Sequence, residues 1–192
     1  MKWLIALCLL IPPTACVAKT RYQNSQLHIS FRYPRNFSLT EEDLDSNDIG
    51  LGYLGPIPTE FVGPGGVGVA TVEAPKNLYP NTDLVNAFFT VNINGQIGRE
   101  QCEQFPGNDG YPQDLVTRKI HRRIFRGLEI DGAGMGHQFS ATYFHTFANN
   151  ECYEFGYGIA TAGYGAVDGL KQAPRKQIES KLQTILDSVR IK

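Results

Sequence analysis

The fold is decided by residues 139–160, which read FSATYFHTFA-NN-ECYEFGYGIA. Two stretches rich in aromatic residues flank Asn149-Asn150, a pair suited to the positive φ angles of a tight hairpin turn. Any symmetric even loop centred there pairs Phe147 with Cys152 and His145 with Glu154. The sequence therefore predicts a β-hairpin in this register.

Side chains alternate between the two faces of a strand, so the hairpin has two distinct surfaces. One surface carries Ala141, Tyr143, His145, Phe147, Cys152, Glu154, Gly156 and Gly158. The other carries Phe144, Tyr153, Phe155, Tyr157 and Ile159. Since both surfaces include apolar groups, we expect the hairpin to be central in its sheet and covered on two sides.

Helices are expected to provide this cover. Pro174 suits the first turn of a helix, and apolar residues follow at helical spacing: Ile178, Leu182, Ile185, Leu186 and Val189. A short helix over residues 98–105 would hold Cys102 against Cys152 on the opposite face. The expected fold class is α+β, a mostly antiparallel sheet with helices on both faces (an α/β/α sandwich) and one disulfide.

Further strands are expected over residues 27–33, 67–74 and 84–93, with a hairpin over 117–130 that turns at Arg126-Gly127. The conformation of the Gly-rich residues 49–68 is left open. Gly63, Gly65 and Gly68 have the spacing G-x-G-x-x-G, but strand-like sequence follows where a dinucleotide site needs a helix. No cofactor is predicted.

The first 18 residues have the pattern of a signal peptide. Lys2 precedes nine apolar residues, a stretch too short for a membrane span of about 20 residues. Cleavage after Ala18 would release residues 19–192 as one globular domain, secreted or periplasmic. Thr14-Ala15-Cys16 also resembles the end of a bacterial lipobox, and a lipid on Cys16 would instead give an outer-membrane lipoprotein.

Export leaves two of the four cysteines, Cys102 and Cys152. In an oxidising compartment such a pair is bridged more often than it is free. The bridge would stabilise the chain by about 4 kcal/mol in the loop-entropy account. We therefore predict a disulfide between them.

Residues 29–37, ISFRYPRNF, resemble the entry F-x-Y-P-x-x-F/W of PsbP-like proteins. The predicted helix over 174–189 resembles the closing helix of the same family. Its members include photosystem accessory subunits, binders of small GTPases and envelope proteins. The resemblance implies a mostly antiparallel sheet and a non-catalytic docking scaffold whose partner it does not name.

Two groups of residues could carry chemistry. His145 opposite Glu154 is predicted to be a polar pair, and a His–carboxylate pair can also transfer protons. The sequence pattern supplies no nucleophile for it, so no catalytic residue is predicted. A basic run could bind an anion or line an exposed sheet edge, and it comprises Arg118, Lys119, Arg122, Arg123 and Arg126. The four histidines lack the spacing of metal ligands, and no metal is predicted.

The formal net charge of −1 over 192 residues gives no field that would attract nucleic acid. The favoured hypothesis is an exported, non-enzymatic binding or accessory protein of the bacterial cell envelope, with an unknown protein or polymer as partner. The alternative is a small secreted hydrolase that uses the pair His145–Glu154. That alternative requires a cleft beside the pair.

Overall fold

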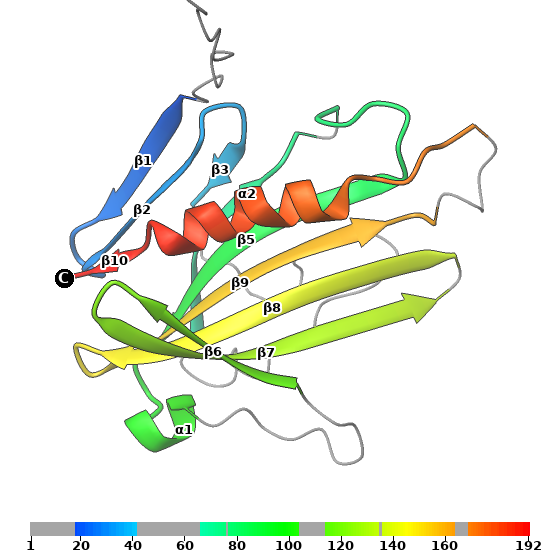
Figure 1. Cartoon of the computed structure of the whole chain (residues 1–192). Helices are drawn as coiled ribbons and strands as arrows, with labels where there is room; N and C mark the ends of the chain where they lie inside the picture. The colour runs from blue at the N-terminus through cyan, green and yellow to red at the C-terminus, as the bar shows by residue number, and fades with distance from the viewer. Residues whose placement is uncertain (1–17, 42–65, 76, 104–113, 135, 164–168) are drawn as a thin grey trace, which may run out of the picture.

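The computed structural model describes residues 18–41, 66–75, 77–103, 114–134, 136–163 and 169–192 (Figure 1). The strands are β1 (Lys19–Asn24), β2 (Ile29–Pro34), β3 (Ser38–Thr40), β4 (Gly66–Glu73), β5 (Leu84–Asn94), β6 (Asp114–Ile120), β7 (Arg123–Gly134), β8 (His137–Ala148), β9 (Glu151–Thr161) and β10 (Arg190–Ile191). The helices are α1 (Arg99–Glu103) and α2 (Arg175–Asp187). Cys16, nearly all of the predicted signal peptide and residues 49–65 lie outside the described residues.

A seven-stranded antiparallel sheet forms the body of the protein, in the order β3-β4-β5-β9-β8-β7-β6. The hairpin β8–β9 lies at its centre, as the sequence predicts. Asn149 and Asn150 form the turn with φ angles of 53° and 61°. His145 lies opposite Glu154, and Phe147 lies opposite Cys152. The predicted register is confirmed.

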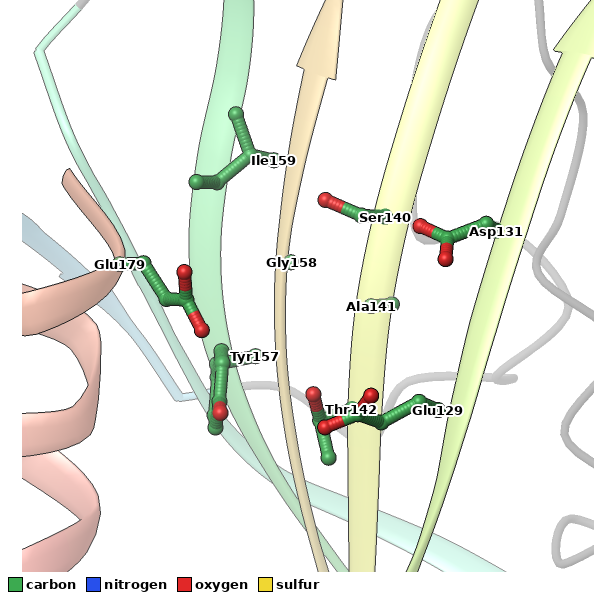
Figure 2. A pocket seen from close by; sticks show the side chains of 9 residues that line it. All are labelled: Glu129, Asp131, Ser140, Ala141, Thr142, Tyr157, Gly158, Ile159 and Glu179. Atoms are coloured by element: carbon green, nitrogen blue, oxygen red, sulfur yellow. The ribbon is translucent and has the colours of Figure 1, made fainter. Parts of the chain in front are cut away.

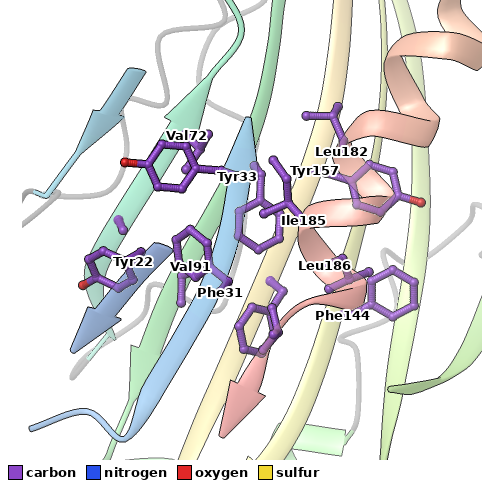
Figure 3. Close-up of a cluster of buried hydrophobic side chains, with 14 of the residues drawn as sticks. Tyr22, Phe31, Tyr33, Val72, Val91, Phe144, Tyr157, Leu182, Ile185 and Leu186 are labelled. Atoms are coloured by element: carbon purple, nitrogen blue, oxygen red, sulfur yellow. The ribbon is translucent and has the colours of Figure 1, made fainter. Parts of the chain in front are cut away.

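One face of this sheet, the α2 face, is covered by α2 together with a second sheet of order β1-β2-β10 (Figure 1). The apolar stripe of α2 is buried against β9 and β5, as predicted. Aromatic rings join the two sheets, since Phe31 of β2 meets Phe89 of β5 with ring centroids 5.3 Å apart. Figure 3 shows Phe31 among the side chains of this core. Phe89 in turn lies beside Phe155 of β9. The main core is therefore on this side.

The expectation of helices on both faces is wrong. On the opposite face, the α1 face, the described cover is the five-residue helix α1, which packs mainly against β8 and β9. The sheet covers much of this face with its own side chains. The ring of Tyr143 lies over Gly156 and the ring of Phe88 over Gly158, so closely that a Cβ on either glycine would collide. Most of the described residues are in antiparallel strands, with one long helix.

One local expectation also differs from the structure. The hairpin β6–β7 turns at His121-Arg122, where His121 has φ of 54°, rather than at Arg126-Gly127. Gly127 lies inside β7 because the ring of Phe144 occupies the space beside its Cα. The turn after Pro34, in which the Phe37 N–H donates to the Pro34 carbonyl oxygen, leads from β2 in the small sheet to β3 in the large one.

Candidate functional site

The predicted disulfide is confirmed and joins α1 to the central strand β9. The Cα atoms of Cys102 and Cys152 are 5.6 Å apart, and both residues are fully buried. Ile97 and Phe147 pack against the pair. Because Cys152 lies on the α1 face, the bridge holds α1 over the polar residues of the central hairpin.

His145 and Glu154 form a buried pair beneath α1. Nε2 of His145 lies 2.8 Å from Oε2 of Glu154, and Nδ1 lies 3.0 Å from the carbonyl oxygen of Cys102. A carbonyl oxygen only accepts hydrogen bonds, so Nδ1 carries a hydrogen. The short contact between Nε2 and Oε2 therefore needs a hydrogen of its own, in addition to the one on Nδ1. Asn92 completes the group by donating to Oε1 of Glu154 at 2.9 Å.

The surroundings of this pair differ from those of a solvent-facing catalytic dyad. His145 and Glu154 expose 5% and 2% of their surface. Nearby Tyr143 is also buried, and its hydroxyl has no hydrogen-bond partner among the described residues. Burial, and secondarily the charge of Glu154, raise the pKa of Tyr143 well above its usual value. The chemistry that this arrangement supports is the satisfaction of buried polar groups beside the disulfide.

The predicted basic run does not form one patch. Strand alternation puts Arg118 and Arg123 on the α2 face and Lys119 and Arg126 on the α1 face, with Arg122 in the turn between them. Arg118 is paired with Asp187 of α2 at 2.8 Å, and Arg126 with Glu103 of α1 at 3.5 Å. Two of the five charges thus bind α2 and α1 to the edge hairpin.

A pocket of about 130 Å³ lies on the α2 face, between α2 and β7 (Figure 2). Its lining residues, which we call the acidic pocket, are Glu129, Asp131, Ser140, Ala141, Thr142, Tyr157, Gly158, Ile159 and Glu179. They include three carboxylates and no lysine, arginine or histidine. Thr142 and Tyr157 lie between Glu179 on the helix side and Glu129 on the β7 side. The pocket faces away from the pair His145–Glu154.

Strand register builds the wall and floor of the acidic pocket. Glu129 of β7 lies opposite Thr142 of β8, which lies opposite Tyr157 of β9. The next row along the same face is Asp131, Ser140 and Ile159. No sequence motif marks this site. The alternating pairs Glu129/Asp131 and Ser140/Thr142 are visible in the sequence, but their juxtaposition depends on the pairing of β7 with β8, which a turn at residue 126 would have shifted.

In the described part of the chain, no three His, Cys, Asp or Glu side chains come together closely enough to hold a metal ion. Neither described helix is long and apolar enough to cross a membrane.

The chain is similar to several solved structures. No family model and no curated protein sequence matches the chain. A protein from Bacteroides thetaiotaomicron is 12% identical with a TM-score of 0.48, and the match covers 90% of this chain and 48% of that one. The chain thus spans about half the length of the Bacteroides protein.

Two further structures match over most of both chains. The cyanobacterial PsbP of Synechocystis is 13% identical with a TM-score of 0.45, covering 95% of this chain and 97% of that one. LpqN, a protein involved in cell envelope biogenesis of Mycobacterium tuberculosis, is 10% identical with a TM-score of 0.45, covering 84% and 81%. The presence of a PsbP among these neighbours agrees with the resemblance predicted from the sequence.

Proposed function

We propose that this protein is exported and acts as a non-enzymatic binding or accessory protein of the bacterial cell envelope. The observation that carries the binding role is the acidic pocket, a concave site with three carboxylates on two facing walls. The buried disulfide supports the export, because such bridges persist in oxidising compartments and are rare in the cytosol. The partner is a protein or polymer of the envelope.

The hydrolase alternative has less support. It requires His145 and Glu154 to meet a substrate, yet both are buried and His145 is occupied by the backbone of α1. A substrate would have to displace a helix that the disulfide holds in place. If substrate turnover were nevertheless found and were abolished by His145→Ala, the non-enzymatic proposal would be wrong.

Site-specific photo-crosslinking in the producing cell tests the binding role. A photoreactive residue replaces Ser140, which lines the acidic pocket, and a control places the same residue at the exposed Glu41. We expect one discrete envelope adduct from position 140 and none from position 41. Equal labelling from both positions, or no adduct from position 140, would contradict the proposal.

Intact mass of the purified mature chain tests export and processing. We expect a chain that starts at Lys19 and gains two hydrogen atoms on reduction. A chain that starts at Cys16 and carries acyl groups would assign the lipoprotein form. A full-length chain with free thiols, recovered from the cytosol, would contradict export.

A further inference from the structure

We propose that the acidic pocket binds an alkylammonium group, carried either by a free linear polyamine or by a lysine side chain of a partner protein. This inference rests on the proposed binding function and adds the chemical class of the ligand to it. Three features of the pocket support it: its charges, an unused hydroxyl at its floor and the spacing of its carboxylates.

The charge of the pocket is uncompensated. Glu129 and Asp131 are exposed, and neither carboxylate has an ion pair or side-chain hydrogen bond among the described residues. On the facing wall, Glu179 accepts a hydrogen bond from Gln183, a neutral side chain. Three like charges around a small pocket repel one another, and a bound cation would relieve that repulsion.

A basic side chain, Arg175, lies beyond one end of the site. Arg175, in the first turn of α2, donates to Gln138 and Thr161, which form the strand pair next to Ser140 and Ile159. Its guanidinium is therefore held one row beyond the pocket lining. Asp131 lies in the row next to this end, so a cationic ligand would keep its charge near Glu129, one row farther from Arg175.

Thr142 is the second and independent indication of a ligand. It lies at the floor of the pocket, is only 7% exposed, and its hydroxyl has no hydrogen-bond partner among the described residues. A hydroxyl on a nearly enclosed side chain that makes no bond within the described chain is free to bond a group that enters the pocket. An ammonium, with three donors, can serve this oxygen and a carboxylate together.

The spacing of the carboxylates favours an organic ammonium over a metal ion. Glu129 and Asp131 are two residues apart on one strand, a separation of roughly 7 Å at the usual rise. Glu179 belongs to the opposite wall (Figure 2). A metal ion needs its ligands at about 2–2.6 Å, and no such cluster exists among the described residues. An alkylammonium chain tolerates longer and more variable contacts, and its methylenes can lie against Ile159.

Isothermal titration calorimetry at low ionic strength tests the ligand class, with spermidine as one probe and a blocked Gly-Lys-Gly-Lys-Gly peptide as the other. We expect binding of at least one probe to the wild-type chain. E129Q/D131N should weaken it about five- to twentyfold, given the usual strength of partly exposed ion pairs. The control E41Q/E100Q removes the same two charges outside the pocket and should leave the affinity within about twofold.

A third variant tests the hydroxyl. Thr142→Val keeps the side-chain shape and breaks no described hydrogen bond, so it should weaken binding about threefold or more while the melting temperature does not fall. Spermidine binding alone assigns a free polyamine, and peptide binding alone assigns a lysine side chain. If neither probe binds, or if both double variants weaken binding equally, the inference is wrong. The photo-crosslink from position 140 would then still stand or fall by itself, which separates this inference from the proposed function.

Discussion

Replacing Tyr143 with phenylalanine removes one buried hydroxyl while keeping the ring that covers Gly156. The hydroxyl has no hydrogen-bond partner among the described residues. Because leaving a polar group unsatisfied is unfavourable by about 1–3 kcal/mol, we expect Tyr143→Phe to raise the free energy of unfolding by about 1 kcal/mol at neutral pH. The melting temperature should rise by about 2–4 °C for a chain of this size.

Tyr153 offers a matched control. It is also a buried tyrosine on the central hairpin, but its hydroxyl lies 3.1 Å from the carbonyl oxygen of Leu27 and 3.0 Å from the carboxylate of Glu151. Tyr153→Phe removes the hydrogen bond that this single O–H donates to these acceptors, and it should destabilise by about 0.5–1.5 kcal/mol. Urea denaturation with the disulfide intact measures both variants. If Tyr143→Phe destabilises the protein as much as Tyr153→Phe, the assignment of an unsatisfied hydroxyl is wrong.

The same variant gives a pH dependence of known sign. Burial raises the pKa of Tyr143 in the folded chain above the value near 10 of the unfolded chain. Above pH 10 the unfolded chain therefore loses this proton first, and the free energy of unfolding falls as pH rises, by about 1.4 kcal/mol per unit for one such group. Tyr143→Phe should show a shallower loss between pH 10 and 11.5. An unchanged slope would contradict burial of the neutral phenol.

Three further outcomes are expected. Replacing both Cys102 and Cys152 with serine should lower the free energy of unfolding by about 2–4 kcal/mol in urea, and an unchanged midpoint would mean that the bridge does not brace the fold. Gly127→Ala, whose Cβ would lie 2.7 Å from an aromatic ring, should lower the melting temperature, whereas Gly95→Ala, with no atom within 4 Å, should change it little. Glu154→Ala removes the carboxylate that bonds Nε2 of the buried His145, and it should lower the free energy of unfolding by about 3–5 kcal/mol as measured by calorimetry. A loss below about 1 kcal/mol would contradict the burial of this pair.

The centre of the fold could be predicted from the sequence because its signals are local. Asn149-Asn150 sets the turn, the turn sets the register, and the register places Cys152 on the face opposite the α2 stripe. The disulfide and the pair His145–Glu154 follow from that register and from export chemistry. The turn, the register and the pair His145–Glu154 use residues close together along the chain, where propensity and alternation decide the outcome. The disulfide joins residues 50 apart, and it could be predicted because export leaves only these two cysteines.

What could not be predicted depends on long-range pairing. Residues 29–34 read as a half-buried strand, but nothing in them shows that the partners are residues 19–24 and 190–191 rather than the large sheet. The acidic pocket has the same origin, because Glu129 meets Thr142 only through the pairing of β7 with β8. The sequence predicts the turn at Gly127 because glycine is common in turns. Glycine is equally suited to a strand position where a neighbouring ring, here that of Phe144, leaves no room for a Cβ.

The small sheet also sets an order of events during production of the protein. Its middle strand β2 precedes every strand of the large sheet along the chain, while its partner β10, residues 190 and 191, follows all of them. A chain emerging from a ribosome therefore carries β2 with one edge unpaired until residue 191 has been released. The small sheet can be completed only after all the strands of the large sheet have been made.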